Sequence, residues 1–285
     1  MNHIIFFNQT DSDILFYRFE IDKHYKTIRR IGVGTYASVT LAQCLSTGKL
    51  VAIKLARGNT SVELLKNEAK ILKHVESEYF PELIQFSIDK FMNKAYLVME
   101  YIEGSSLDEF WLNNDIVSEE QVWKYLRQVV EAIENMHSKG VVHRDIKPQN
   151  IIITKDNKVK IIDFNISKIS TLLAQNKYNE ANETWKFHGK FFTQISSPLF
   201  AAPEISTLDY YTESIDIWGI GIILLCLMNT KLIHSEKLDI RCILENVNEE
   251  FDWYSDSLII LLSKLLSNDA NDRPWINELK DMVTN

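Results

Sequence analysis

The segment from His143 to Asn150 brings together side chains that could carry out a reaction. Within six residues, Asp145, Lys147 and Asn150 supply a carboxylate, an ammonium and an amide. The carboxylate can orient a hydroxyl, the ammonium can offset the charge of a transferred group, and the amide can hold Mg²⁺. Together, these three functional groups suit phosphoryl transfer.

A further carboxylate, Asp163, follows eleven residues after Ile152. We expect two short strands, Ile151–Thr154 and Val159–Ile162, so that Asp163 stands at a strand end. Because Mg²⁺ prefers oxygen ligands and phosphates over an all-protein cage, Asp163 and Asn150 are predicted metal ligands. A polar loop would explain any one of these residues, but it explains the whole set in this order poorly.

Two glycines upstream, Gly32 and Gly34, stand where one expected strand turns into the next. Glycine lets the backbone approach a phosphate, whose oxygens can then face amide N–H groups. The pair is a weak signal alone, because glycine pairs are common in hairpins. The third glycine of such a loop is also missing, since Ala37 stands in its place.

Lys54 is predicted to need a charged partner. It lies in the apolar run Val51-Ala52-Ile53-Lys54, and burying a lone ammonium is expensive. Glu68 could supply the opposite charge from the expected helix Ser61–Val75, in which apolar residues recur at spacings of three and four. Taken alone, Lys54 would be interpreted as a surface lysine of a strand.

The elements that must position these groups differ between the two halves of the chain. Residues 25–102 contain β-branched and aromatic runs typical of strands, at Tyr25–Ile31, Ser38–Cys44, Lys49–Leu55, Leu83–Ile88 and Ala95–Glu100. From residue 118 the spacing of apolar residues becomes helical, with Ser118 as a predicted N-cap and a helix end near Gly140. Later helices are expected to begin near Asp216, Ser255 and Pro274. We expect the joint between the halves around Glu103–Ser106.

Length and composition restrict the class of protein. The chain has 285 residues and a formal net charge of −8, so nucleic acid is not an expected partner. The three cysteines fit neither a disulfide framework nor a zinc site and favour a cytoplasmic, intracellular setting, with the nucleus left open. No secretory signal is evident. The apolar stretch Ile217–Met228 is too short to span a bilayer and is predicted to be a buried core helix.

The ordered motifs resemble the eukaryotic protein kinase family from about Tyr25 to the C-terminus. The resemblance rests on the glycine-rich loop, on Lys54 and Glu68, and on His143-Arg144-Asp145, Asp163-Phe164, Ala202-Pro203-Glu204, Asp216-Ile217-Trp218-Gly219 and Arg273. It implies an α+β, two-lobed fold. A small antiparallel β-sheet lobe with one key helix would occupy residues 25–102, and a larger, mainly α-helical lobe would occupy residues 103–285. Residues 1–24 would be an N-terminal extension, which could add a hairpin to the small lobe or remain a variable tail, and residues 163–204 the activation segment.

The family's roles, carried over to matching positions, imply use of ATP and Mg²⁺. The catalytic set would be Asp145 as the base, Lys147 beside the γ-phosphate, Lys54 on the α- and β-phosphates, and Glu68 as the partner of Lys54. Asn150 and Asp163 would bind Mg²⁺. Nucleotide contacts would come from the phosphate loop (Gly32, Val33, Gly34), from the residues around adenine (Ile31, Val39, Ala52, Ile152), from Met99 as gatekeeper, and from the backbone of Glu100 and Ile102.

Two further sets of residues match structural features of the family. Leu72, Phe86, His143 and Phe164 fall where the family stacks an apolar column that joins the two lobes. Glu204 and Arg273 match its buried ion pair, which we interpret as structural and not catalytic.

The catalytic loop resembles the serine/threonine class, because Lys147 follows two residues after Asp145. Ser197 would replace the threonine that bridges these two residues in that class. Arg144 predicts control by phosphorylation of the activation segment, since a phosphate there would give this arginine an anionic partner. The preferred acceptor is Thr193, followed by Ser196 and Thr184. An insertion is expected around Ala174–Lys190, because the activation segment is somewhat long for the family.

Three departures from the family pattern leave alternatives open. Ala37 adds only a methyl and should stiffen the phosphate loop without blocking it. Asn165 replaces the glycine of Asp-Phe-Gly, and asparagine is among the few residues that tolerate positive φ. We therefore expect slower or more restricted switching of that segment, without loss of Mg²⁺ binding. Ser196 replaces a further glycine.

The main hypothesis is an active serine/threonine protein kinase with protein substrates and, by default, a monomeric state. A non-enzymatic pseudokinase that binds nucleotide or partners is the second hypothesis. A small-molecule kinase of the related fold is the third, although Ala202-Pro203-Glu204 argues against it. Gln149 and Ser106 stand where many basophilic kinases carry acids, so a strong preference for basic substrates is not predicted.

Overall fold

The computed structural model describes residues 21–89, 92–112, 117–169, 200–207, 212–229 and 240–284. The predictions at Thr184, Thr193, Ser196, Ser197 and Ala174–Lys190 lie outside these residues, as does most of the extension 1–24. The chain divides into two compact units. The small unit comprises Met1–Glu103 and Phe164–Ile166, and the large unit comprises Gly104–Asp163 and Ser167–Asn285.

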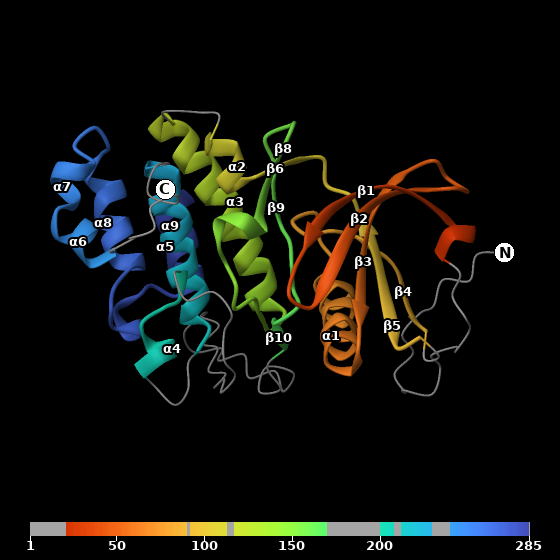
Figure 1. The fold of residues 1–285 in the computed structure, drawn as a ribbon. Helices are drawn as coiled ribbons and strands as arrows, with labels where there is room; N and C mark the ends of the chain where they lie inside the picture. The colour runs from red at the N-terminus through yellow and green to blue at the C-terminus, as the bar shows by residue number, and fades with distance from the viewer. Residues whose placement is uncertain are drawn as a thin grey trace. The chain divides into compact units, whose positions relative to one another are not determined.

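The small unit is built on a five-stranded antiparallel sheet (Figure 1). Its strands are β1 (Tyr25–Val33), β2 (Ala37–Cys44), β3 (Leu50–Arg57), β4 (Leu83–Asp89) and β5 (Lys94–Glu100), in the order β1-β2-β3-β5-β4. The short 3₁₀ turn η2 (Ile21–Lys23) precedes β1. Each predicted strand lies on one of these five, and the ends differ by at most two residues.

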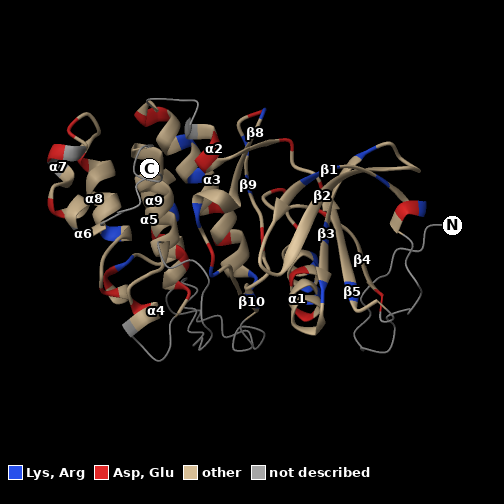
Figure 2. Ribbon diagram, in the orientation of Figure 1, with Lys and Arg blue, Asp and Glu red and all other residues tan. Residues whose placement is uncertain are grey.

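Helix α1 (Asn59–Val75) covers the whole predicted range and begins two residues earlier than expected. Acidic and basic residues both occur along it (Figure 2). Most of these charges face water, whereas Glu68 is buried in this fully described helix together with Val62, Leu65, Ala69, Ile71, Leu72 and Val75. The apolar stripe predicted from the sequence thus carries one carboxylate into the interior of the small unit.

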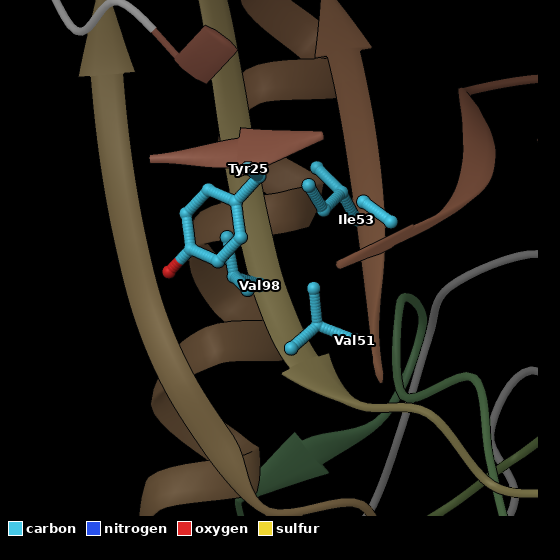
Figure 3. Close-up of a cluster of buried hydrophobic side chains, with 5 residues drawn as sticks. Tyr25, Val51, Ile53 and Val98 are labelled. Atoms are coloured by element: carbon cyan, nitrogen blue, oxygen red, sulfur yellow. The ribbon is translucent and has the colours of Figure 1, made fainter. Parts of the chain in front are cut away.

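The alternation of side chains along β3 gives the sheet two different faces. Lys54 points toward the face on which α1 lies, since it contacts Glu68 of that helix. Its neighbours Val51 and Ile53 point to the other face. There they form a buried apolar cluster (Figure 3) with Tyr25, Ala42 and Val98. The sheet is therefore packed on both faces while Lys54 is directed toward the helix.

The large unit is mainly helical (Figure 1). Its helices are α2 (Leu107–Leu112), α3 (Glu119–Ser138), α4 (Glu204–Thr207), α5 (Ser214–Met228), α6 (Ile240–Glu245), α7 (Val247–Glu250), α8 (Asp256–Leu265) and α9 (Ile276–Thr284), with the 3₁₀ turns η3 (Pro148–Asn150) and η6 (Ala270–Asp272). Strands β6 (Gly104–Ser106), β8 (Ile151–Thr154) and β9 (Val159–Ile161) form one small sheet, and β7 (Val141–Val142) pairs with β10 (Lys168–Ile169). A small antiparallel sheet with one helix and a mainly helical second unit confirm the predicted α+β class.

Helix α3 begins and ends where the sequence indicates. The Oγ of Ser118 accepts a hydrogen bond from the backbone N–H of Gln121 at 3.3 Å, which satisfies one of the open donors of the first turn. The helix ends at Ser138, and Gly140 then takes a φ of +76°. This left-handed turn, which glycine adopts without strain, sends the chain into β7 and the catalytic loop.

Helix α5 is the centre of the large unit. Every residue from Ile215 to Met228 is buried, as predicted for a core helix. None of the described helices combines the length and the apolar character that crossing a membrane requires.

A buried ion pair connects two distant segments of the large unit. The guanidinium of Arg273 donates to both carboxylate oxygens of Glu204, at 2.6 and 2.8 Å. It also donates to the carbonyl oxygens of Ser267 and Ser214 and lies over the ring of Trp218 at 5.0 Å. All three nitrogens of the guanidinium donate hydrogen bonds within the protein, which agrees with a structural and not a catalytic role for the ion pair.

We expect Arg273→Ala to lower the free energy of unfolding by about 3–5 kcal/mol, because it leaves the carboxylate of Glu204 buried without its cation. Arg273→Lys should recover only part of this loss, since lysine lacks the bidentate geometry. Urea unfolding measures both changes. The control is Lys280→Ala, which removes a partly exposed pair with Glu134 and should cost less than about 1 kcal/mol. Equal losses at the two positions would contradict the structural role.

Candidate active site

Lys54 and Glu68 form a buried ion pair in the small unit. The Nζ of Lys54 in β3 donates to both carboxylate oxygens of Glu68 in α1, at 3.0 and 2.8 Å. Lys54 is 8% exposed and Glu68 is 0% exposed, so removing either charge would leave the other buried alone. The structure thus brings the two predicted partners together and fixes the position of the ammonium.

Other predicted nucleotide residues share the sheet face of Lys54. Val39 of β2 pairs with Lys54, and Ala52 of β3 pairs with Met99 of β5. Because side chains of directly paired residues lie on one face and alternate along each strand, these four residues face the same side. Ala52 is buried, so the face beside Lys54 is small and apolar.

The end of β5 carries the two residues whose backbone is predicted to contact adenine. The N–H of Glu100 donates to the carbonyl of Glu82 at 2.9 Å. The predicted backbone contact of Glu100 with adenine would therefore be made by the carbonyl oxygen of Glu100. Its side chain accepts from the N–H of Glu82 at 3.2 Å. Ile102, the second predicted residue, follows the strand and is buried.

The glycines of the phosphate loop are not needed for the local fold. The N–H of Gly34 donates to the carbonyl of Ala37 at 2.8 Å, which closes the turn between β1 and β2. Neither Gly32 nor Gly34 has a positive φ, and a Cβ at either would have its nearest neighbour at 3.6 Å, an ordinary contact. The missing side chains instead leave the backbone open, as an approaching phosphate requires. The flanking Ile31 and Val33 are exposed.

The catalytic loop gathers its three predicted groups around one carboxylate in the large unit. Lys147 Nζ donates to Oδ2 of Asp145 at 2.7 Å. Asn150 Nδ2 donates to the same oxygen at 3.1 Å and to the backbone carbonyl of Asp145 at 2.8 Å. Asp145 is 7% exposed. The carboxylate is therefore held in one orientation by a cation and an amide, each from the segment where the sequence placed it.

The two predicted metal ligands belong to adjoining segments of the large unit. Because Nδ2 of Asn150 donates to Asp145, its Oδ1 is the atom left for a cation. The carbonyl of Asn150 accepts from the N–H of Ile162 at 2.9 Å, one residue before Asp163. Over the described residues, no three His, Cys, Asp or Glu side chains are grouped as a metal site. One carboxylate and one amide oxygen fit Mg²⁺, which takes its other ligands from phosphates and water.

The positive φ angles near the Asp163-Phe164-Asn165 segment do not fall on residue 165. The sequence analysis noted that asparagine tolerates positive φ, but the structure does not use this tolerance at Asn165. The left-handed residues are Asp163, with a φ of +70°, and Arg144, with a φ of +73°. Asn165 has no such φ, although its Oδ1 is buried without a hydrogen-bond partner in the described part of the chain. Its effect on switching stays a prediction.

Asp216, at the start of α5, organises the catalytic loop. Its Oδ2 accepts from Nε2 of His137 at 2.9 Å and from the N–H of His143 at 2.8 Å, and its Oδ1 accepts from the N–H of Arg144 at 2.8 Å. Burial alone would raise the pKa of Asp216, but the hydrogen bonds from His137 and from the backbone of Arg144 lower it below its ordinary value. A charged acceptor thus fixes two consecutive peptide groups of the loop.

Sequence reasoning recognised Asp216 as part of a motif but missed this role. The available signal was an acid at the start of an otherwise apolar helix. It also missed Ser167, whose Oγ donates to the carbonyl of His143 at 3.0 Å. The sequence analysis likewise named Gly219 as part of a motif without giving it a role. A Cβ at this position would lie 2.5 Å from Cβ of Ile146. Glycine therefore lets the helix approach the catalytic loop closely.

His143 is buried as a neutral ring. Its Nδ1 accepts from the N–H of Asp145 at 3.3 Å, so the ring proton is assigned to Nε2, which donates to the carbonyl of Ile162 at 3.2 Å. Burial lowers the pKa of His143, although the carboxylates of Asp216, Asp145 and Asp163 oppose the shift. The imidazole acts as a fixed hydrogen-bonding link and not as a charge.

The other predicted members of the site lie in separate units. Leu72, Phe86 and Phe164 are buried in the small unit, and His143 is buried in the large unit. Ile152, in β8, also belongs to the large unit. The apolar column between the lobes and the contact of Ile152 with adenine therefore stay predictions.

Comparison with known proteins identifies similar chains. The profile of the family described as "Protein kinase domain" matches residues 25–283. Maternal embryonic leucine zipper kinase of Xenopus tropicalis is 30% identical over 267 residues, which cover 91% of this chain and 39% of that protein. Serine/threonine-protein kinase ssp1 of Schizosaccharomyces pombe is 30% identical, covering 90% and 42%. CBL-interacting serine/threonine-protein kinase 12 of Arabidopsis thaliana is 31% identical, covering 90% and 51%. The chain therefore spans about two-fifths to one-half of the length of these relatives.

We expect the free energy of unfolding to fall as the pH drops from about 7 to about 5. The unfolded chain protonates His143 near a pKa of about 6.5, whereas burial lowers the pKa of His143 in the folded state. The unfolded state then binds more protons, so stability is lost on acidification. Urea unfolding at several pH values should show a flatter slope for His143→Phe.

The matched control for this prediction is His74→Phe, which removes an exposed imidazole from the small unit. An unchanged slope in a folded His143→Phe variant would show that His143 is not held neutral.

Proposed function

This chain belongs to the protein kinase family, and we propose that it transfers the γ-phosphate of Mg·ATP to serine and threonine hydroxyls of protein substrates. The observation that carries the proposal is the carboxylate of Asp145, held by Lys147 and Asn150. The serine/threonine class is supported by Lys147 and by the names of two relatives, the serine/threonine-protein kinases of S. pombe and A. thaliana.

In this proposal Lys54 binds the α- and β-phosphates of the nucleotide. An ammonium in a buried strand would be costly to keep charged without a partner, and Glu68 supplies that partner through two hydrogen bonds. The open backbone at Gly32 and Gly34 would face the phosphates. The apolar residues Val39, Ala52 and Met99 would contact adenine on the same sheet face.

Asp145 would orient the hydroxyl of the substrate and accept its proton. This requires a carboxylate in a fixed direction, which the hydrogen bonds from Lys147 and Asn150 provide. Lys147 would in addition offset the negative charge that spreads over the transferred phosphoryl group. Asp145 would thus act on the hydroxyl that receives the phosphoryl group, and Lys147 on the phosphoryl group itself.

Asn150 and Asp163 would hold the metal. Mg²⁺, when bound, would neutralise charge on the phosphates. The proposal assigns it to Oδ1 of Asn150 and to the carboxylate of Asp163, because these are the oxygen donors that adjoin the catalytic loop. The left-handed backbone at Asp163 would set the direction of its side chain.

Regulation by the activation segment is part of the same proposal. Arg144 precedes the catalytic base, and Lys168 of β10 lies near enough that the charge of Arg144 adds to burial in lowering the pKa of Lys168. Two neighbouring cations would be stabilised by a phosphate. Thr193, the preferred acceptor, lies outside the described residues.

We expect Asp145→Ala to reduce γ-phosphate transfer by about 10²–10⁴-fold and to leave ATP affinity near the wild-type value, because the base acts on the hydroxyl. Asp163→Ala should weaken Mg·ATP binding as well as turnover. The assay uses purified protein with Mg²⁺, labelled ATP and a generic serine/threonine substrate, and ATP affinity is measured separately with and without Mg²⁺.

Asp156→Ala is the matched control, since this aspartate lies exposed between β8 and β9. Full activity of Asp145→Ala would refute the assignment of the base, and wild-type affinity and rate in Asp163→Ala would refute the metal site. Mg-dependent ATP binding without transfer, even after phosphorylation of the activation segment, would favour the pseudokinase. Transfer to a small metabolite but not to protein would favour the small-molecule kinase.

A further inference from the structure

The peptide group between His143 and Arg144, in the catalytic loop, is held at both of its polar atoms. Its oxygen accepts a hydrogen bond from Oγ of Ser167 at 3.0 Å. Its N–H donates to Oδ1 of Asp216 at 2.8 Å. Because the C=O and the N–H of a trans peptide point in opposite directions, the two side chains hold this peptide from opposite sides.

Ser167 reaches the peptide oxygen because β7 pairs with β10. Lys168 lies opposite Val142 at the end of this antiparallel ladder. One further step in the same register places Ser167 opposite His143, and there the side-chain hydroxyl bonds the carbonyl. Ser167 and His143 both belong to the large unit, so the contact lies within one unit.

The hydrogen bond joins two groups that water does not reach. Ser167 is 1% exposed and His143 is 0% exposed. Burying a hydroxyl is unfavourable unless it is hydrogen-bonded, and a buried carbonyl that loses its donor is equally costly. Removal of Oγ from Ser167 would therefore weaken the hold on the peptide oxygen.

Arg144 needs this hold because its backbone is strained. Its φ of +73° is a left-handed conformation that a residue other than glycine keeps only where its surroundings impose it. A flip of the His143–Arg144 peptide would change ψ of His143 and φ of Arg144 together and would let Arg144 leave the left-handed region. The flip would also reverse the C=O and the N–H, and it would break the bonds to Ser167 and Asp216.

We propose that Ser167 is a positioning residue for Asp145, the base of the proposed function, on which this inference rests. The hydroxyl of Ser167 opposes the flip of the His143–Arg144 peptide. Asp145 follows Arg144 directly, and its N–H donates to Nδ1 of His143 at 3.3 Å. The conformation of this peptide therefore sets the direction of the Asp145 carboxylate, and a flip would change that direction.

Ser167 offers a narrower test of this idea than Asp216 does. Asp216 also accepts from His137 and from the N–H of His143, so replacing it would disturb several contacts of the loop. Ser167 contributes one side-chain oxygen to the His143–Arg144 peptide, and its replacement by alanine removes that oxygen.

The kinetic test compares Ser167→Ala with wild type in γ-phosphate transfer. We expect kcat to fall by about five- to thirtyfold, because a buried carbonyl loses its donor and the flipped peptide becomes populated. The KM for ATP should stay at the wild-type value, since the change acts on Asp145 and not on the nucleotide contacts. A serine that only supports the core would lower the thermal midpoint and leave kcat of the folded protein unchanged.

The matched control is Ser263→Ala. The Oγ of Ser263 donates to the carbonyl of Ile259 at 3.1 Å in α8 of the large unit, and its removal should change kcat by less than about twofold. Ser167→Thr keeps the hydroxyl and should recover part of the lost rate. Should Ser167→Ala not fold, Ser167→Cys, whose thiol is only a weak donor, replaces it in the same comparison.

A second comparison tests the route through Arg144. Glycine adopts a positive φ without strain, so the flip relieves less strain in the Arg144→Gly variant. Ser167→Ala should therefore lower kcat by a smaller factor in the Arg144→Gly background than in wild type. An equal or larger factor would contradict this route.

Amide hydrogen exchange tests the flip without any need for activity. Asp216 accepts from the N–H of both His143 and Arg144, but only the Arg144 N–H belongs to the peptide whose oxygen Ser167 holds. Ser167→Ala should speed exchange at Arg144 by about five- to thirtyfold and at His143 by much less. Equal acceleration at both amides would show a general loosening of the loop and would overturn the inference.

The outcomes separate the inference from the proposed function. Transfer by wild type with an unchanged kcat in folded Ser167→Ala would overturn the inference alone, whatever the exchange at Arg144. A wild-type protein that binds Mg·ATP without transfer would overturn the proposed function, and exchange at Arg144 would still decide whether Ser167 holds the peptide.

Discussion

The catalytic loop depends on one buried carboxylate, that of Asp216. An ionised group away from water is stable only when its oxygens accept strong hydrogen bonds, and Asp216 accepts three, from His137 and from the backbone N–H groups of His143 and Arg144. These bonds hold Arg144 in a left-handed conformation, with a φ of +73°. The chain can then turn so that Asp145 meets Lys147 and Asn150. Without that acceptor, two buried N–H groups would lack partners and the turn would lose its support.

The small unit also buries charged side chains, and there an ion pair offsets the cost of removing them from water. Glu68 and Lys54 are both buried, and each offsets the cost of burying the other. Replacing both by apolar residues could cost the fold little, because a buried pair contributes little net stability. A pair that stability does not require points to a use of the charge itself, and a fixed ammonium in an apolar strand is suited to bind phosphate. The Arg273–Glu204 pair differs, since its guanidinium is also bound by two carbonyls and a ring.

Much of this could be predicted from the sequence, because the relevant signals are local. Alternation fixed the five strands to within two residues, spacing fixed α1 and α3, and the apolar surroundings of Lys54 called for an acid such as Glu68. The backbone conformation at Asp163, Arg144 and Asn165 could not be predicted in this way. At Arg144 it depends on the hydrogen bond to Asp216, which lies 72 positions away in the sequence. The sequence drew attention to Asn165, which replaces a glycine of the family pattern, whereas the positive φ occurs two residues earlier, at Asp163.

Only two protein side chains are proposed to bind the metal, and this small number bears on whether Mg²⁺ can bind before ATP. Asn150 and Asp163 offer one amide oxygen and one carboxylate, and the described residues hold no larger cluster of acids, histidines or cysteines. Mg²⁺ needs six oxygens in near-octahedral geometry and keeps several waters when protein ligands are few. Two protein oxygens would hold it weakly, and the phosphates of a nucleotide would complete the set. In the proposed function the metal would therefore enter together with ATP, whose phosphates would complete the ligand set that Asn150 and Asp163 of the large unit begin.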